Sequence, residues 1–335
     1  MATLTAAPSL PLWMRGDQLF RELTDAKAVI QSGTSFTVTV GNGVYTFTGA
    51  GFSTPNGAGF PKTGVIFGIT YSAPGDGQAV LTGISMQASA FNTFLPDKAA
   101  LHAALFAGND VITGSSGKDW LMGYDGDDTL YGGLGRDVLD GGRGADKMVG
   151  GGGGDLYIVD NVGDRVIENP GTGEDIVRAW VSFDARGQDI ERVELYGRNN
   201  TNVIGNDLDN TLVGSAGNNV IVGGGGRDLM TGGAGADRFD FNAVSESPFG
   251  AYDRITDLSN QDVIDLSTID ANTRVAGNQT FTLVDAFTGV AGQLTLTWVE
   301  RGGFTVLDAD TNGNGIADFR VILNGDHRDF DNFIL

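Results

Sequence analysis

Five consecutive blocks of nine residues run from Gly114 to Ile158 and read GSSGKDWLM, GYDGDDTLY, GGLGRDVLD, GGRGADKMV and GGGGGDLYI. The sixth place of every block is aspartate, and the eighth place is always apolar or aromatic. The sixth-place residues are Asp119, Asp128, Asp137, Asp146 and Asp155, and Asp110 precedes them in the same frame. Self-similarity at a short fixed period predicts a solenoid of stacked β-strands.

Each block divides into a turn and a short strand. The glycine-rich first six places do not suit an ordinary strand or helix, because glycine tolerates positive φ and leaves room for backbone carbonyls to turn inward. In the last three places, as in residues 138–140, the central side chain points inward and its neighbours point outward. One inward side chain per block cannot bury a core, so two blocks should form one coil of 18 residues. Asp119 then lies beside Asp137.

The stacked aspartates predict a metal. No basic residue recurs at matching spacing, so the carboxylates would repel each other without a cation. Calcium accepts about six to eight oxygen ligands at flexible geometry, whereas magnesium prefers a strict octahedron and keeps its waters. Zinc prefers His or Cys, and the chain has two His and no Cys. The expected cofactor is therefore Ca²⁺, with several ions bound.

A second run of blocks covers residues 205–240 and reads GNDLDNTLV, GSAGNNVIV, GGGGRDLMT and GGAGADRFD. Its sixth places are Asn210, Asn219, Asp228 and Asp237. Asparagine keeps an oxygen ligand but loses the charge, so sites that use Asn210 or Asn219 should be weaker. A flexible glycine linker is excluded for both runs, because a linker would not keep the phase.

Composition limits the partners and the location. The net charge of −21 argues against nucleic acids and anionic membrane surfaces. The absence of cysteine excludes disulfides, and no apolar stretch is long enough for a transmembrane helix. The N-terminus lacks the features of a Sec signal peptide. Cytosolic calcium is too scarce to fill low-affinity sites, so we expect a secreted protein.

The sequence predicts an all-β fold in three parts. Residues 1–104 are expected to form a β-rich cap or cargo region, with a hairpin at Ser35–Val40 and Val44–Thr48. Residues 105–240 form the solenoid, and its coils at 156–204 are irregular because the nine-residue phase is lost there. Residues 241–335 form a C-terminal cap.

These blocks resemble the repeats of RTX (repeats-in-toxin) exoproteins. Residues 241–335 are similar to the C-terminal domain of serralysin-type secreted metallopeptidases, through the stretches Tyr252–Asp257, Asp262–Asp270 and Asp310–Phe319. The resemblance spans residues 105–335. It implies a parallel β-roll that binds calcium, a β-sandwich-like C-terminal cap and export by type I secretion machinery. The chain end, Asp331–Leu335, resembles the uncleaved export signal of such proteins.

The resemblance also implies a ligand set. In RTX rolls the carbonyls at places two and four of one block, and at places one and three of the block two further on, join both aspartates around each ion. One ion would then use Ser115, Gly117 and Asp119 with Gly132, Leu134 and Asp137, and the next would use Tyr124, Gly126 and Asp128 with Gly141, Arg143 and Asp146. The same pattern adds Asp110, Gly135, Gly144, Gly150, Gly152 and Asp155, and in the second run Asn210, Asn219, Gly226, Asp228, Gly232, Ala234 and Asp237.

Two acidic segments outside the repeated blocks leave a choice open. Asp160, Asp164 and Asp175 could bind an ion or be solvated turn carboxylates, and the second interpretation is favoured. The segment from Asp308 to Phe319 is similar to an EF-hand loop. Its twelfth place lacks the bidentate glutamate, so a tight hairpin turn is favoured.

Catalytic signatures are missing from the sequence. Serralysins carry His-Glu-x-x-His, but the two histidines here, His102 and His327, lie in different regions, and no Gly-x-Ser-x-Gly motif occurs. We expect a non-enzymatic structural or cell-surface protein. One alternative is a glycan- or partner-binding surface in residues 1–104, formed by Trp13, Phe47, Phe67 and Tyr71. A carboxylate-based glycosidase or lyase in the same region is less favoured.

Overall fold

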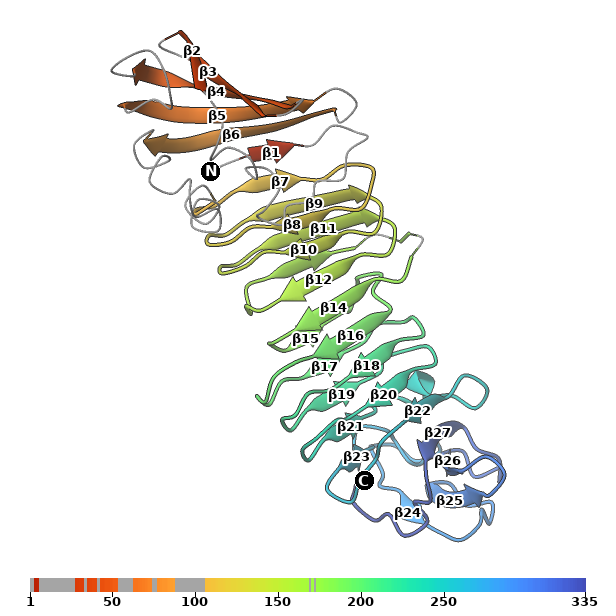
Figure 1. Ribbon diagram of the computed structural model, residues 1–335. Helices are drawn as coiled ribbons and strands as arrows, with labels where there is room; N and C mark the ends of the chain where they lie inside the picture. The colour runs from red at the N-terminus through yellow and green to blue at the C-terminus, as the bar shows by residue number, and fades with distance from the viewer. Residues whose placement is uncertain are drawn as a thin grey trace. The chain divides into compact units, whose positions relative to one another are not determined.

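The computed structural model describes residues 3–5, 28–32, 35–40, 43–53, 63–73, 77–87, 106–168, 170–171 and 173–335. Within these ranges the regular elements are β-strands apart from η2, a single 3-10 turn at Val244–Glu246 (Figure 1). This confirms the predicted all-β class. The chain forms two compact units, Met1–Gly173 and Glu174–Leu335.

The roll in the first unit consists of short parallel strands that alternate between two sheets. One sheet contains β7 (Val111–Thr113), β9 (Thr129–Leu134), β11 (Lys147–Gly152) and β13 (Arg165–Ile167). The other contains β8 (Trp120–Met122), β10 (Val138–Asp140) and β12 (Leu156–Val159). Leu139 pairs with Leu121 in one sheet, and Met148 pairs with Leu130 in the other. The predicted coil of two blocks is confirmed.

The core of this roll is a column of eighth-place side chains. Leu121, Leu130, Leu139, Met148 and Tyr157 are each 0 % exposed. Their neighbours on the short strands are half-buried, as in β10. Burial of one such apolar side chain contributes roughly 1.5–3 kcal/mol, so the ladder of single residues supplies the hydrophobic stabilisation of the roll.

The turns need glycine where stacked blocks meet. Gly135 has a φ of 130°, and a Cβ there would overlap the carbonyl of Gly117 in the block 18 residues earlier. Both the backbone conformation and the close contact exclude a larger residue. Glycine at place four therefore lets the turns stack at the spacing of the strands.

The first unit also contains an antiparallel sheet. The predicted hairpin is confirmed by β3 (Ser35–Val40) and β4 (Gly43–Ser53), which pair with Val40 opposite Gly43. The sheet continues on one side through β2 (Ala28–Ser32) and on the other through β5 (Thr63–Ala73) and β6 (Gly77–Gln87). β1 (Thr3–Thr5) lies between β6 and β7 and joins this sheet to the roll.

The second unit repeats the roll with two longer stacks of strands (Figure 1). One stack contains β14 (Ile176–Ala179), β16 (Arg192–Leu195), β18 (Thr211–Val213), β20 (Leu229–Thr231) and β22 (Asp253–Ile255). The other contains β15 (Phe183–Asp184), β17 (Val203–Ile204), β19 (Val220–Val222), β21 (Arg238–Asp240) and β23 (Val263–Asp265). Leu212, Ile221, Met230 and Phe239 are 0 % exposed and fill the interior.

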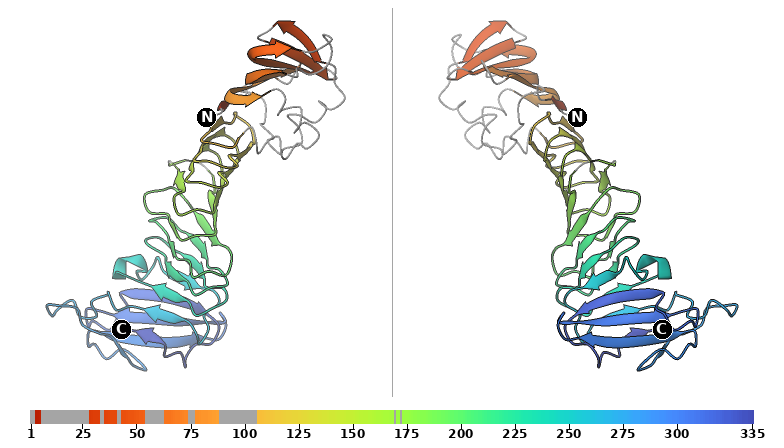
Figure 2. Two further views of the ribbon diagram at one scale, coloured as in Figure 1. Left: turned by 90° about the vertical axis from the view of Figure 1, so that its left-hand side faces the viewer. Right: turned by 90° about the vertical axis from the view of Figure 1, so that its right-hand side faces the viewer.

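The C-terminal strands extend both stacks. β22 pairs in parallel with β27 (Phe319–Asn324), which is followed by antiparallel β26 (Phe304–Asp310) and β25 (Gln293–Val299) and by β24 (Thr282–Leu283). The longer blue strands lie side by side in Figure 2. β28 (Phe333–Ile334) pairs in parallel with β23. Within the described part of the chain, no helix is long and apolar enough to cross a membrane.

Candidate metal sites

The sixth-place aspartates form buried columns along the turns of the roll. Asp128, Asp137 and Asp146 are 2 % exposed or less. In each column, one carboxylate oxygen accepts a hydrogen bond from the backbone N–H of the residue 18 positions earlier. The Asp119 N–H donates to Asp137 Oδ1 at 2.8 Å, and the Asp128 N–H donates to Asp146 Oδ1 at 2.7 Å. The stacking predicted for Asp119 and Asp137 is present.

The second carboxylate oxygen of these residues is different. In six of the column aspartates, the Oδ2 atom is buried and accepts no hydrogen bond from any described residue. These are Asp128, Asp137, Asp146, Asp228, Asp237 and Asp253. A buried polar atom without a partner costs about 1–3 kcal/mol, and more when the group is charged. A column of such oxygens is a set of ligands directed at a position that a cation could occupy.

Burial also changes the acidity of these groups. Desolvation, with smaller contributions from the nearby carboxylates of Asp155 and Asp119, raises the pKa of Asp137 to about 7. Desolvation likewise raises the pKa of Asp128 to about 7 and that of Asp228 to about 7. Without metal, the fold therefore favours the neutral carboxylic acids over the charged carboxylates. A divalent cation requires the carboxylates as ligands and would stabilise them.

Backbone carbonyls meet the unpaired oxygens at the first-place glycines. A Cβ added to Gly132 would lie 2.6 Å from Asp137 Oδ2 and 2.6 Å from the carbonyl oxygen of Gly150. Glycine thus leaves a space between an aspartate of one block and a carbonyl of the block two further on. The donors are all oxygens and mix carboxylate with carbonyl, which is the chemistry that calcium prefers.

The turns of alternate blocks also bond to each other through the backbone. The N–H of Leu134 donates to the Ser115 carbonyl at 3.1 Å, and the N–H of Arg143 donates to the Tyr124 carbonyl at 2.6 Å. Each carbonyl oxygen has a second lone pair. The structure therefore brings together the blocks that were expected to share an ion, although these carbonyls already accept one hydrogen bond.

The side chains of the two sixth-place asparagines form hydrogen bonds within the protein. Asn210 Oδ1 accepts the N–H of Asn206 at 2.8 Å, and its amide donates to the Ile190 carbonyl at 2.8 Å. Asn219 Oδ1 accepts the N–H of Ser215 at 2.7 Å, and its amide donates to the Thr201 carbonyl at 2.5 Å. Both side chains are hydrogen-bonded within the protein, so neither presents an unpaired buried oxygen as Asp137 does.

Three further aspartates belong to these columns, although the sequence did not predict them there. Asp146 N–H donates to Asp164 Oδ1 at 3.0 Å, so Asp164 continues the first-unit column. In the second unit Asp253 Oδ1 accepts from Asp228 N–H and Asp262 Oδ1 accepts from Asp237 N–H, each across 25 residues. The sequence signal was the triplet of aspartate, any residue and an apolar residue. Asp164 keeps the nine-residue phase of the blocks, whereas Asp253 and Asp262 are displaced from it.

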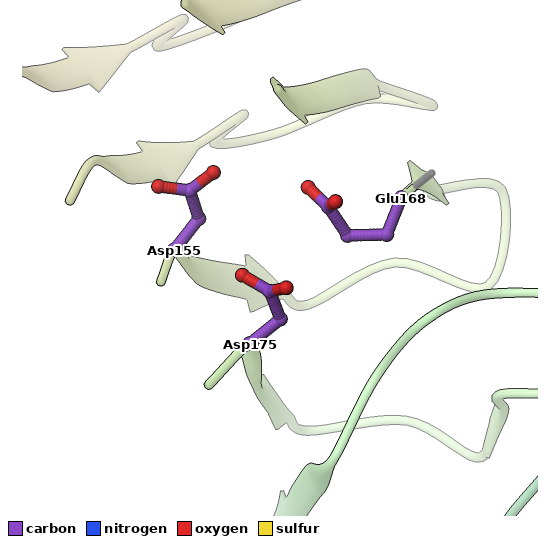
Figure 3. A group of neighbouring side chains, drawn as sticks. All are labelled: Asp155, Glu168 and Asp175. Carbon is purple, nitrogen blue, oxygen red and sulfur yellow. The ribbon is translucent and has the colours of Figure 1, made fainter. Parts of the chain in front are cut away.

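A further buried carboxylate lies at the end of the other first-unit column. Glu168 is 6 % exposed and accepts hydrogen bonds from the Tyr157 hydroxyl and, at 3.3 Å, from the Gly151 N–H. Carboxylate oxygens of Asp155 and Glu168 lie within 4.8 Å of each other (Figure 3). Glu168 was not expected as a site residue, because no periodic signal marks its position.

The turn arginines pair with exposed carboxylates outside the columns. Arg143 contacts Asp125 at 3.6 Å, and Arg227 contacts Asp209 at 3.1 Å. All four side chains are more than half exposed, so these pairs contribute little stability. They do not neutralise Asp128, Asp137 or Asp146.

The remaining sequence candidates have ordinary roles or lie outside the described residues. The segment from Asp308 to Phe319 is a hairpin between β26 and β27, in which Asp310 accepts the N–H groups of Gly313 at 2.6 Å and Gly315 at 2.7 Å. Phe47 is 0 % exposed and belongs to the core, so it cannot contribute to an aromatic binding surface. Trp13 and His102, and the side chains of Phe67 and Tyr71, lie outside the described residues.

Comparison with solved structures gives distant similarities. The AlgE6R2 subunit of the Azotobacter vinelandii mannuronan C5-epimerase shares 22 % identity over 46 % of this chain and 91 % of its own, with a TM-score of 0.34. The AlgE6R3 subunit shares 21 % identity over 68 % and 78 %, with a TM-score of 0.24. Extracellular lipase LipA from Serratia marcescens shares 17 % identity over 68 % and 38 %, with a TM-score of 0.19. None of these similarities bears on the activity of this chain.

No curated protein matches the chain. The family described as "Peptidase M10 serralysin C terminal" matches residues 107–335, which include the roll, the columns of aspartates and the C-terminal strands. The match covers well over half of the chain and agrees with the parallel roll found above. The chain therefore belongs to the serralysin C-terminal family and carries its RTX β-roll.

Proposed function

We propose that the chain is a secreted calcium-binding protein whose roll folds when Ca²⁺ binds between the stacked turns. The observation that carries this proposal is the set of buried carboxylate oxygens without a hydrogen-bond partner, as in Asp128, Asp137 and Asp146. A divalent cation would offset both their desolvation and their mutual repulsion. Calcium fits because every donor in the turns is a carboxylate or carbonyl oxygen.

The proposed ligands are those of the stacked turns. Asp119 and Asp137 would hold one ion with the carbonyls of Ser115, Gly117, Gly132 and Leu134. Asp128 and Asp146 would hold the next with the equivalent carbonyls of their blocks. In the second unit Asp228 and Asp253 form the corresponding pair. The Asn210 and Asn219 positions need no ion, because their side chains are hydrogen-bonded already.

Calcium would supply a large part of the stability. A site with free calcium at about ten times its dissociation constant stabilises the folded state by roughly 1.4 kcal/mol. Several such sites approach the total stability of a typical domain, about 5–15 kcal/mol. Binding and folding would then be one event, which occurs where calcium is abundant, outside the cell.

Export would depend on the C-terminal segment. The serralysin C-terminal family supports export by type I secretion machinery. In the folded protein the Ile334 carbonyl accepts the Leu266 N–H at 2.8 Å, so this segment is the edge strand β28. A transporter would therefore read the segment before β28 pairs with β23, that is, before calcium folds the chain.

The matched region argues for a non-enzymatic role, because the family is that of a C-terminal domain without the catalytic centre of the protease. His327 hydrogen-bonds the Asn324 carbonyl through Nε2 at 2.7 Å, which occupies a potential metal-binding nitrogen. A structural or cell-surface protein is the function that fits these observations. A binding or enzymatic role of residues 1–104 remains the competing hypothesis.

Calcium titration of the whole protein tests the proposal. Far-ultraviolet circular dichroism at pH 8 should show a sharp gain of β structure on adding Ca²⁺ after EDTA treatment, and no comparable gain with Mg²⁺. Isothermal calorimetry should show weaker or fewer sites in Asp137→Asn than in the parent. Asp125→Asn is the matched control, because Asp125 is 60 % exposed. Equal β structure in EDTA and in calcium would exclude the proposal.

A further inference from the structure

The outward face of one sheet in the second unit carries a concentration of arginine. This sheet runs from β14 through β16, β18, β20 and β22 to β27, β26 and β25. Its solvent-accessible charged side chains are Arg178, Arg192, Arg254, Arg320, Glu194 and Asp308. A chain with a net charge of −21 thus presents a face on which cations outnumber anions.

Strand register joins these residues into one surface. A continuous row of paired residues crosses six strands, namely Ile176, Arg192, Thr211, Leu229, Arg254 and Ile322. Neighbouring strands lie about 4.8 Å apart, so the row is roughly 24 Å long. The row is long enough to accommodate an extended polymer.

One end of this face is an exposed aromatic stack beside two guanidinium groups. The rings of Trp180 and Tyr196 stack with centroids 5.0 Å apart, and the residues are 41 % and 38 % exposed. Arg178 and Arg192 both bind Glu194, at 3.1 Å and 2.7 Å. Two guanidinium groups share one carboxylate, so Glu194 neutralises only one of their two positive charges.

The other end is a shallow hollow of about 350 Å³. Its lining includes Tyr252, Phe304, Val306, Asp308, Arg320 and Ile322. Arg320 donates two hydrogen bonds to Asp308, at 2.6 Å and 2.7 Å. The guanidinium of Arg254 lies 5.5 Å from the centroid of the Phe304 ring. Arginine and an aromatic ring therefore occur together at both ends of the face.

We propose that this face binds an extended anionic polysaccharide, whose carboxylate or sulfate groups contact the arginines and whose sugar rings pack on the aromatic side chains. Arginine suits such groups because its planar guanidinium binds paired oxygens. Trp180 and Tyr196 offer apolar ring surface together with polar edges, which suits the apolar faces and the hydroxyls of a sugar. Thr211 and Thr231 provide hydroxyls between the two ends.

The shape and surroundings of the face favour a single narrow chain. Its parallel strands are three or four residues long, so the strip is only about 10–13 Å wide. Exposed Asp209 lies just before β18 and exposed Asp257 just after β22. A membrane or a nucleic-acid duplex would contact these acidic edges, whereas one polysaccharide chain would not. At physiological salt the charge elsewhere on the protein is screened beyond about 8 Å.

The test uses the full-length protein at constant, saturating calcium and measures binding calorimetrically. Oligogalacturonate and chondroitin sulfate are the anionic probes, and dextran is the neutral one. We expect both anionic probes to bind and dextran not to bind. Arg178→Gln/Arg192→Gln should weaken binding about tenfold, as expected for two lost charge contacts. Trp180→Ala, which removes an exposed ring, should also weaken it.

Arg227→Gln is the matched control, because Arg227 is exposed on a turn outside this face. It should bind like the parent protein, and circular dichroism in calcium should show that every variant is folded. The proposal is overturned if neither anionic glycan binds. It is also overturned if the folded double variant and Trp180→Ala both bind as tightly as the control, or if poly-glutamate or anionic vesicles bind at least as tightly as the glycans.

Discussion

The carboxylate of Asp137 has one oxygen held by the N–H of Asp119 at 2.8 Å and a second oxygen that is buried without a hydrogen-bond partner among the described residues. The bound oxygen fixes the side chain at a definite angle in the turn. The second oxygen borders the space left by Gly132, which the carbonyl of Gly150 borders as well. A structural hydrogen bond and a proposed metal ligand thus belong to the same side chain.

Asn219→Asp tests the difference between the two kinds of sixth-place residue. The amide of Asn219 donates to the Thr201 carbonyl at 2.5 Å and to Ser215 Oγ at 3.2 Å, and aspartate cannot donate either bond. We expect the calcium-free protein to lose about 1–3 kcal/mol of unfolding free energy. Urea unfolding in EDTA measures this loss, with trimethylamine N-oxide added so that the calcium-free chain is folded at the start.

Asn218→Asp is the control for that experiment. Asn218 is exposed, and its Oδ1 accepts the Ala236 N–H at 3.0 Å, a role that aspartate retains. Its unfolding free energy should stay close to that of the parent. If Asn219→Asp also left the unfolding free energy unchanged, the idea that the hydrogen bonds of Asn219 take the place of a bound ion would be wrong.

The stability of the metal-free roll should fall as the pH rises. Desolvation raises the pKa of Asp137 from 3.8 to about 7 and that of Asp146 to about 6. A carboxyl whose pKa is higher in the folded chain binds protons preferentially there. Its contribution is fully present below about pH 4 and is lost as the pH rises through 6 to 7.

In EDTA with the same osmolyte, the urea midpoint should therefore be higher at pH 5 than at pH 8. In saturating calcium the order should reverse, because the ligands must be deprotonated to bind the ion. Matched unfolding curves at both pH values give the comparison. A higher urea midpoint at pH 8 than at pH 5 in EDTA would contradict the raised pKa values of Asp137 and Asp146.

Gly135→Ala should destabilise the first-unit roll by more than the backbone strain alone. Gly135 has a φ of 130°, and its added Cβ would overlap the Gly117 carbonyl. Strain at positive φ costs about 1–2 kcal/mol, and the displaced turn adds to it. Gly250→Ala is the comparison, since Gly250 has a φ of 114° and no atom within 4 Å of a Cβ. Equal thermal shifts would show that turn stacking is unimportant.

Leu139→Ala should cost about 2–5 kcal/mol, because it leaves a cavity in a core only one side chain wide. Leu139 is 0 % exposed, whereas Leu134 at the end of β9 is 62 % exposed. Leu134→Ala should change the stability by less than about 0.5 kcal/mol. Chemical unfolding of both variants in calcium makes the comparison, and similar losses would argue against the single-residue core.

The sequence alone determined the repeating part of the fold. The regular spacing of Asp119 and Leu121 from the equivalent residues of the other blocks predicted the two-block coil. It also predicted the inward side chain and the column of carboxylates. These features are local, because each follows from residues within one block or from two blocks at a fixed separation. The hairpin of β3 and β4 was equally accessible, because Gly41 to Gly43 mark its turn.

Only the tertiary structure decided which residues outside the phase join the columns. Asp253 and Asp262 lie 25 residues after Asp228 and Asp237, since an inserted loop with η2 lengthens the coil before the next strand. Glu168 reaches the space near Asp155 through a turn with no periodic signal. Nothing in the sequence states how much chain an irregular coil will contain.

The arginine face was likewise invisible to the sequence. Alternation within β14 and β22 places Arg178 and Arg254 on the outside of each strand, but not beside one another. Register between strands distant in sequence, such as β22 with β27, makes them one surface. Local pattern fixes the direction of a side chain, whereas its neighbours across a sheet depend on pairings that form only when the whole chain has folded.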